Sequence, residues 1–299
     1  MNTVPIKTSG KWILCGEHAV LRGSLALAFP IDSQYFSLQY QTDSHPLTFE
    51  CKNGRDLPHL KPFVSALEKG LEIIKRKSTD LKGTIQIDAN IPLGAGLGGS
   101  ASLCVAVGKL FCEIGFLPDD QLFSFSQSLE NIFHGQSSGV DVAVVIARKG
   151  ISFFRGGEFT PIEMSWQPNW YLLHSGIYSK TAEDIKKVQR FISANAKAGQ
   201  ALDDIINESS HNCLKALRDN EVSGLKLLSQ SIDNAANCFS EWELIPEAMR
   251  NKMEALREAG ALAVKPTGSG GGGFILSLWP AKFTPPKHFN LLPINEMRL

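Results

Sequence analysis

The sequence predicts an α+β protein with two domains. At 299 residues the chain is long enough for a large core, and its length favours two domains over one. Alternating polar and apolar residues at 84–90 are typical of a half-buried strand, whereas apolar residues recur at helical spacing within 60–77. Proline and tryptophan interrupt these patterns around residues 163–168. We therefore expect an N-terminal domain at 1–165 and a C-terminal domain at 166–299.

The composition excludes several classes of protein. The formal net charge is zero and there is no basic block, so nothing indicates binding to nucleic acid or to an anionic membrane. No apolar run approaches the ~20 residues of a membrane-spanning helix, and the N-terminus lacks an apolar signal core. Six cysteines are scattered without C-x-x-C pairs and are expected to be buried thiols. We expect a cytoplasmic protein, monomeric or homodimeric.

A glycine-rich stretch, Ile91–Ser102, separates the strand at 84–90 from an apolar segment, Ala101–Cys112, that is expected to be an enclosed helix. Its four glycines are Gly94, Gly96, Gly98 and Gly99. Glycine allows a positive φ and lets the backbone approach a ligand closely. A loop of this kind at the start of a helix directs unpaired N–H groups toward one point, where the helix dipole favours negative charge. The stretch therefore predicts an anion site, above all for phosphate.

Three interpretations of this loop compete with one another. Gly94, Gly96 and Gly99 satisfy the G-x-G-x-x-G pattern of dinucleotide-binding folds, but Pro118 begins another helix where that motif requires a second strand. The spacing also resembles a Walker A loop, yet Ser100 stands where lysine is required, so the cation must come from elsewhere in the chain. A plain strand-to-helix turn would need one or two glycines rather than four.

The other N-terminal elements follow from the same patterns. Apolar segments at 11–14 and 25–31 predict two strands, joined by a loop that carries Glu17, His18 and Arg22, and alternation at 33–50 predicts further strands. Pro118 begins a helix with acidic residues in its first turn. The apolar face of this helix is expected at Leu122, Phe125, Leu129, Ile132 and Phe133.

Polar residues follow that apolar face. Glu130 and His134 lie four residues apart and share a different face of the helix. Ser138 and Asp141 have the spacing of a capping box, which places Asp141 in the first turn of a helix, where the dipole keeps its carboxylate ionised. Ordinary alternatives stay open at this point: a solvated carboxylate for Glu130, a structural cap for Asp141, and a polar hairpin tip for Glu17 and His18.

The C-terminal half alternates between strand and helix patterns. A hairpin turn is expected at 155–157, strands at 170–174, 261–264 and 274–279, and helices at 202–217, 224–239 and from Pro246 to Gly260. Thr181–Asp184 has the pattern of a capped helix start. A second glycine loop follows Lys265, between two predicted strands, where a flexible linker is uncommon, so a second backbone cradle is expected. The tail from Pro280 is expected to be an irregular surface segment.

Several of these stretches resemble one known family. Gly10–Gly23 resembles the first motif of the GHMP small-molecule kinases, Pro92–Ser102 their second motif, and Lys265–Phe274 their third. The run Glu130–Asp141 resembles the metal-ligand and catalytic segment of the mevalonate kinases, a branch of the same family. The resemblance implies a ribosomal-protein-S5-like N-terminal domain and a ferredoxin-like C-terminal domain, with the active site between them. It covers most of the chain.

The chemistry of phosphoryl transfer agrees with this resemblance. Donor phosphates must be held, their charge neutralised by Mg²⁺ and cations, and an acceptor hydroxyl aligned. Ser100 and Glu130 can supply hard oxygen ligands to Mg²⁺. Asp141 can accept the hydroxyl proton, and Lys11 can supply the cation that the glycine loop lacks. The family resemblance implies the same roles for these four residues.

The resemblance also implies the cofactor and the substrate. The cofactors are ATP and Mg²⁺, and the implied ATP contacts are Pro92, Gly94, Ala95, Gly96, Leu97, Gly98, Gly99, Ser100, Ala101, Ser102 and Gly268. Implied contacts with the acceptor are Glu17, His18, Thr181 and Thr267. Mevalonate is the leading acceptor, and phosphomevalonate, a sugar or homoserine are alternatives. A catalytically inactive sensor of the same fold is a further alternative, against which the retention of all four proposed catalytic and metal residues argues.

Three departures from the family pattern bear on the substrate more than on the family. Gly99 stands where serine is common, Val142 follows Asp141 where mevalonate kinases usually carry asparagine, and Ser9 replaces the usual proline before Gly10. The change at Val142 alters the expected wall of the substrate pocket.

Overall fold

Two long strands, β1 (Thr3–Cys15) and β2 (Ala26–Pro46), begin the fold in the computed structural model, which describes residues 3–52, 58–135 and 137–294. The chain packs into two units, and both strands contribute to each. The first unit consists of residues 1–10, 30–93 and 98–148, and the second of residues 11–29, 94–97 and 149–299. The domain boundary at 165/166 stays a prediction.

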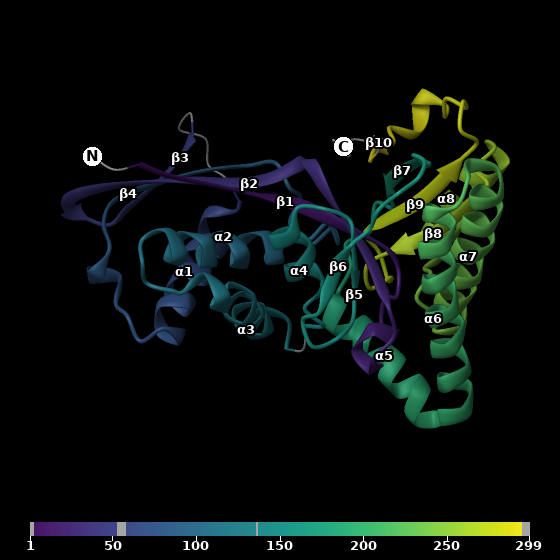
Figure 1. Cartoon of the computed structure of the whole chain (residues 1–299), viewed down its shortest axis with the longest axis horizontal. Coiled ribbons are helices and arrows are strands. Elements are labelled where there is room, and N and C mark those ends of the chain that lie inside the picture. Colours follow the sequence, from purple (N-terminus) through teal and green to yellow (C-terminus); the bar gives the residue numbers. More distant parts are fainter. Residues whose placement is uncertain (1–2, 53–57, 136, 295–299) are drawn as a thin grey trace. The chain divides into compact units, whose positions relative to one another are not determined.

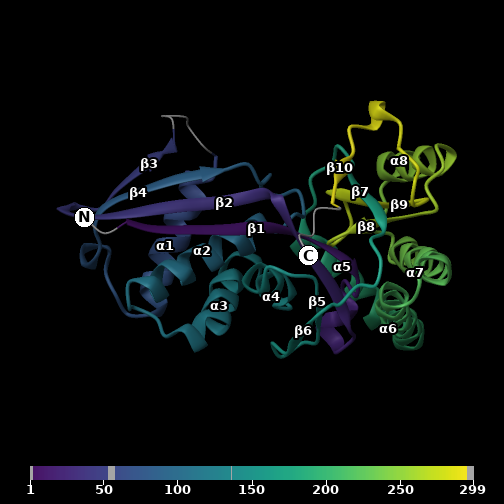
Figure 2. The same ribbon diagram turned by 45° about the horizontal axis from the view of Figure 1, so that its top comes forward.

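The first unit is a sheet with helices on one face (Figures 1 and 2). In the sheet, β4 (Lys82–Ala89) pairs antiparallel with β2, where Ile85 lies opposite Tyr40, and β3 (Thr48–Cys51) runs parallel to β4. The helices of this unit are α1 (Leu60–Ile73), α2 (Gly99–Glu113), α3 (Leu122–His134) and α4 (Val140–Ala147). Helix α2 contacts α1, α3 and α4, which confirms the prediction of a helix enclosed by protein.

The second unit contains an antiparallel sheet in the order β10-β7-β9-β8. Its strands are β7 (Asn169–His174), β8 (Ala263–Thr267), β9 (Phe274–Trp279) and β10 (Leu292–Pro293). Its helices are α5 (Thr181–Ala194), α6 (Ala196–Arg218), α7 (Glu221–Glu241) and α8 (Glu247–Glu258). Helices α6 and α7 pack along one another, and α7 and α8 pack on β8 (Figure 2).

A hairpin and an aromatic cluster complete this unit. The hairpin strands are β5 (Ile151–Phe153) and β6 (Phe159–Pro161), and β5 pairs with the first residues of β2. The indole of Trp12 lies 4.9 Å from the ring of Phe29 and 4.8 Å from that of Trp170, measured between centroids. Short 3₁₀ helices of the two units are Ala19–Arg22, Ser78–Asp80, Asp119–Gln121 and Lys287–Phe289. Within the described residues no helix is long and apolar enough to cross a membrane.

Both helix starts with a predicted side-chain cap differ from the prediction. The N-cap of α4 is Gly139, with a left-handed φ of 90°, and Ser138 Oγ instead accepts a hydrogen bond from Val140 N at 3.3 Å. The N-cap of α5 is Lys180, and Thr181 is the first helical residue. The capping-box prediction was therefore wrong in mechanism, because a glycine ends the loop before α4, although Asp141 does lie in the first turn.

Four other predictions are corrected by the structure. The apolar face of α3 excludes Ile132 and Phe133, which are 49% and 41% exposed, whereas the Glu130 side chain is buried. Strand β2 continues through residues 31–33, where we expected a break. The tail includes β10, which pairs with β7. All six cysteines are free thiols, but Cys51 and Cys112 are only half-buried.

Candidate functional site

At the first glycine loop the chain passes from the first unit into the second and returns to the first within a few residues. Gly94–Leu97 packs with the second unit, whereas Leu93 and Gly98 belong to the first. The side chains of Ala95 and Leu97 are buried, which anchors this stretch from one side. Gly98 has a φ of 76° and is the N-cap of α2, so the predicted loop at the start of a helix is confirmed. The first turn of α2 therefore offers backbone N–H groups that have no acceptor within the helix.

In the second unit the two glycine loops lie side by side. A Cβ atom on Gly273 would lie 2.8 Å from the carbonyl oxygen of Ala95, and one on Gly268 would lie 3.8 Å from that of Gly96. The two backbones therefore approach each other in a way that a side chain at position 273 would prevent. Lys11, on β1, joins this arrangement: its N–H donates to Leu97 O at 2.9 Å, and its side chain is buried.

Glu17 forms a buried ion pair with Lys265, a residue that the sequence analysis did not select. Lys265 Nζ lies 2.5 Å from Glu17 Oε1, and the two side chains are 0% and 2% exposed. The same carboxylate oxygen accepts a hydrogen bond from Gly268 N at 3.4 Å. Burial raises the pKa of Glu17, and the Lys265 charge opposes that rise. The pair links the first motif to the third.

His18 is held beside the same loop. Its Nε2 lies 2.8 Å from Ser269 O, and because a carbonyl oxygen only accepts, Nε2 carries the proton. The ring packs edge-on against Phe239 and Trp242, at centroid distances of 5.9 and 5.4 Å. Burial lowers the pKa of His18 to about 4, so the ring is a neutral hydrogen-bond donor at neutral pH.

The other predicted contacts with the acceptor differ in their surroundings. Thr267 is buried, and its hydroxyl exchanges hydrogen bonds with the backbone N and O of Ile13, both at 2.9 Å. Thr181 is half-buried at the start of α5, with its Oγ1 3.4 Å from Ser269 Oγ. The second unit thus brings Lys11, Glu17, His18, Thr181 and Thr267 around the two glycine loops.

In the first unit, Ser100 and Glu130 both act on the Cys104 thiol. Burial raises the pKa of Cys104, the negative charge of Glu130 raises it further, and a hydrogen bond with the Ser100 side chain lowers it. A hydroxyl from α2 and a carboxylate from α3 therefore both act on the same thiol. This hard-oxygen pair fits Mg²⁺, which takes one or two protein ligands and keeps several waters. No group of three or more His, Cys, Asp or Glu residues within the described parts of the chain could hold a metal ion.

A short hydrogen-bonded chain connects Glu130 to the start of α4. Ser137 Oγ donates to Glu130 Oε2 at 2.5 Å and accepts from Gly139 N at 3.1 Å. Asp141, half-buried, follows in the first turn of α4. The side chain of His134, predicted on the same helix face as Glu130, lies outside the described residues.

Ala101 and Ser102 lie at the start of α2. Both are fully buried, and Ser102 Oγ donates to Ser9 O at 2.6 Å while Thr8 Oγ1 donates to Ser102 O at 3.1 Å. These contacts fix α2 against β1 within the first unit. The roles of both residues in nucleotide binding stay predictions.

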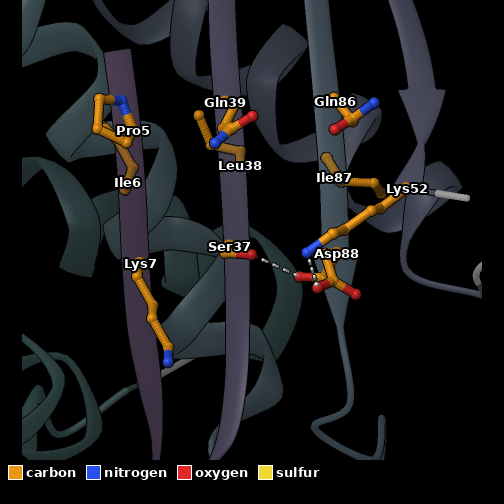
Figure 3. Close-up of a pocket in the computed structure, with 10 residues that line it drawn as sticks. All are labelled: Pro5, Ile6, Lys7, Ser37, Leu38, Gln39, Lys52, Gln86, Ile87 and Asp88. Atoms are coloured by element: carbon orange, nitrogen blue, oxygen red, sulfur yellow. Dashed lines mark hydrogen bonds and ion pairs between the residues drawn. The ribbon is translucent and has the colours of Figure 1, made fainter. Parts of the chain in front are cut away.

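A surface groove of about 210 Å³ lies elsewhere in the first unit, across β1, β2 and β4 (Figure 3). In it, Lys52 Nζ lies 3.5 Å from Asp88 Oδ2, and Ser37 Oγ donates to Asp88 O at 3.2 Å. None of the predicted site residues lines this groove.

Comparison with known proteins identifies one family and several relatives. The family model of the GHMP kinases N terminal domain matches residues 63–149, and that of the GHMP kinases C terminal matches residues 182–281. The mevalonate kinase of Aeropyrum pernix is 27% identical over 288 residues, covering 90% of this chain and 86% of its own length. That of Thermococcus sibiricus is 26% identical over 298 residues, covering 91% and 88%.

Solved structures share the fold. The L. major mevalonate kinase in complex with R-mevalonate has a TM-score of 0.77 at 22% identity, covering 94% of this chain and 88% of that one. The Methanococcus jannaschii mevalonate kinase has a TM-score of 0.75 at 19% identity, covering 97% and 94%. The Lactococcus lactis galactokinase complexed with galactose reaches 0.73 at 18% identity, covering 93% and 86%. The predicted two-domain fold of mixed α and β content is confirmed by these likenesses and by the two family models.

Proposed function

The chain belongs to the GHMP kinases, and we propose that it transfers the γ-phosphoryl group of ATP to the hydroxyl of mevalonate, a step in isoprenoid precursor synthesis. The observation that carries the choice of acceptor is the relatedness to proteins named mevalonate kinase across nearly the whole chain, as with the Aeropyrum pernix relative. The fold of the L. major enzyme bound to R-mevalonate supports the same choice.

On the donor side, the two glycine loops hold the phosphates of ATP. Their backbones pack together in the second unit, and Gly98 starts helix α2 at the end of the first loop. Backbone N–H groups and the helix dipole bind anions without any lysine in the loop. Mg²⁺ would be held by Ser100 and Glu130, and when bound it neutralises phosphate charge. Both groups act on the Cys104 thiol, Ser100 through a hydrogen bond and Glu130 through its charge, which supports this pairing.

Asp141 accepts the proton of the acceptor hydroxyl, or orients that hydroxyl for attack. Asp141 lies in the first turn of α4, at the end of a helix where the dipole favours negative charge. Lys11 stabilises charge on the transferring oxygens, and the hydrogen bond from its backbone to Leu97 fixes its position beside the first glycine loop. An interaction that strengthens as charge develops raises kcat rather than affinity.

On the acceptor side we propose His18 and Thr181 as contacts, together with Glu17 and Thr267. Thr181 is the most accessible of the four, whereas Glu17, His18 and Thr267 are buried. Their hydrogen bonds within the second unit keep the segment that carries them rigid. Preorganisation of this kind lowers the entropy lost when a small acid is aligned for transfer.

Release of ADP on a panel of alcohols tests the proposal. We expect kcat/KM for mevalonate to exceed that for phosphomevalonate, galactose and homoserine, with Asp141→Asn as the inactive control. A clear preference for one of the other three alcohols would overturn the choice of mevalonate as acceptor, while the assignment to the GHMP kinases would stand. ATP binding without turnover of any alcohol would favour the alternative of an inactive sensor.

A further inference from the structure

The glycine loop at Lys265–Phe274, named the third glycine loop because it matches the third family motif, is held on several sides by side chains of the second unit. Ser269 is the centre of these contacts: its carbonyl accepts from His18 Nε2 at 2.8 Å, and its hydroxyl donates to Asp184 Oδ2 at 2.8 Å. The preceding residue, Gly268, donates its N–H to Glu17. Since glycine-rich backbone has unusual conformational freedom, contacts of this kind decide which conformation the loop adopts.

Asp184 is the least expected member of this set. It lies in the first turn of α5 and is 8% exposed, although it has no cationic partner among the ion pairs of the described residues. Its Oδ2 accepts from Ser179 Oγ at 2.9 Å as well as from Ser269. The two hydroxyl oxygens are 2.7 Å apart, which closes a three-membered polar cluster. A buried carboxylate is costly unless such donors satisfy it.

The carboxylate also packs directly on the glycine-loop backbone. A Cβ atom at Gly271 would collide with both oxygens of Asp184, so the side chain occupies the space that glycine leaves. Two residues later in the loop, Gly273 donates its N–H to Ile177 O at 2.7 Å, and Ser175 N donates to Gly273 O at 2.8 Å. Asp184 therefore joins three segments: the 175–180 loop, helix α5 and the third glycine loop.

The electrostatic surroundings of Asp184 agree with a built cluster. Burial raises its pKa, and the hydrogen bonds from Ser269 and Ser179 lower it. The charged side chains that act on it are Glu183, which raises the pKa further, and Lys187, which lowers it. The two hydroxyls are thus the main groups that stabilise the ionised carboxylate.

We propose that Asp184 is a positioning residue that fixes the third glycine loop, through Ser269 and Ser179, in the conformation that binds the donor nucleotide. The link to the nucleotide is the contact between the loops, where Gly268 lies against Gly96. This inference rests on the proposed function, because it takes the paired glycine loops as the phosphate site. In this role Asp184 acts through the loop and through no contact of its own with ATP or the acceptor.

The test compares four variants with the wild-type enzyme: Asp184→Ala, Asp184→Asn, Ser269→Ala and the double variant Asp184→Ala/Ser269→Ala. ADP affinity is measured by calorimetry, which does not depend on turnover, and KM for ATP and kcat are measured separately. Hydrogen bonds to a charged group predict that Asp184→Ala weakens ADP binding by about tenfold to a hundredfold. Ser269→Ala should have a similar effect, and the double variant should be no weaker than the worse single variant.

Glu183→Gln is the matched control. Its side chain lies next to Asp184 in the sequence but is 69% exposed and pairs only with Lys180 among the ion pairs of the described residues. We expect wild-type ADP affinity and KM for this variant. Asp184→Asn keeps one acceptor oxygen, so its ADP affinity should lie between those of the wild type and Asp184→Ala. This variant tests the proposal even if the alanine variant fails to fold.

Wild-type ADP affinity and wild-type KM for ATP in folded Asp184→Asn and Ser269→Ala would overturn the inference. So would losses in the double variant that multiply, because the two residues would then act independently. A wild-type protein that binds ADP but phosphorylates no alcohol would instead overturn the proposed function, and the calorimetric comparison would still decide the role of Asp184.

Discussion

Replacement of Lys265 by methionine removes one half of a fully buried ion pair and should destabilise the protein strongly. Lys265 Nζ donates to Glu17 Oε1 at 2.5 Å and to Pro266 O at 2.6 Å, and lies 5.3 Å from the centroid of the Phe239 ring. Methionine retains much of the volume but no charge. Glu17 Oε2 has no hydrogen-bond partner among the described residues, and the long hydrogen bond from Gly268 N to Oε1, at 3.4 Å, does not replace a positive charge.

The magnitude follows from the charge left behind. Removing one partner of a buried pair costs about 3–5 kcal/mol of unfolding free energy. Burial raises the pKa of Glu17 and Lys265 opposes this, so in Lys265→Met the carboxyl takes up a proton on folding. A folded pKa above the unfolded value of about 4.3 gives stability that is complete below that value and is lost as the pH rises. The deficit of Lys265→Met relative to wild type should therefore be larger at pH 8 than at pH 5.

Urea unfolding followed by circular dichroism at pH 5 and pH 8 measures both effects. Glu17→Gln should be destabilised as well, and Lys265→Met/Glu17→Gln should lose less than the sum of the two single losses, because no charge is left unpaired. Lys180→Met is the control, since its pair with Glu183 is exposed and contributes at most about 1 kcal/mol. A deficit for Lys265→Met below about 1 kcal/mol, or one that does not change with pH, would refute the reasoning.

Three further predictions concern the proposed chemistry and His18. Glu130→Gln should raise the Mg²⁺ concentration needed for half-maximal rate and lower kcat with the fold retained; a wild-type Mg²⁺ response would remove Glu130 from the metal site and leave it a structural role, such as its bond to Ser137. Asp141→Asn and Lys11→Met should each lower kcat by ~10²–10⁴-fold, and the double variant should lose much less than the product, whereas fully multiplicative losses would mean independent action. Because the folded pKa of His18 is about 4, below the unfolded value of about 6.5, stability is complete above pH 6.5 and falls by about 2 kcal/mol on going to pH 5. Asparagine tolerates the positive φ of 59° at position 18, so His18→Asn should remove this pH dependence of stability, as measured by urea unfolding. The same substitution at the exposed His45 should leave the pH dependence unchanged.

The sequence was a good guide wherever local pattern decides the structure. Strand β9 has the predicted bounds, Phe274–Trp279, because an apolar run between a glycine loop and Pro280 leaves little choice. Helix α2 was predicted within two residues at its start, since the glycine loop ends where its apolar run begins. We expected separate strands at 25–31 and 33–50, whereas β2 is one strand, Ala26–Pro46, whose first residues pair with β5 and whose later residues pair with β4.

The site was harder to predict because its contacts join distant residues. Glu17 and Lys265 are 248 positions apart, and a lysine that begins a glycine loop has no local sign of being buried. Asp184 was assigned to an ordinary helix start, since acidic residues are common there. Burial of these three side chains arises from the packing of the first and third motifs, and only the fold supplies that information.

The structure also changes what the motifs can tell about activity. Glu17, His18 and Thr267 each have a structural task, in that they bind Lys265, Ser269 and Ile13 within one unit. A protein that only bound a nucleotide would need the same contacts to keep its glycine loops in place. These residues therefore do not separate an active kinase from an inactive sensor of the same fold. The separation has to come from a residue whose proposed task is chemical, so kcat in Asp141→Asn, measured with ADP affinity unchanged, is the decisive comparison.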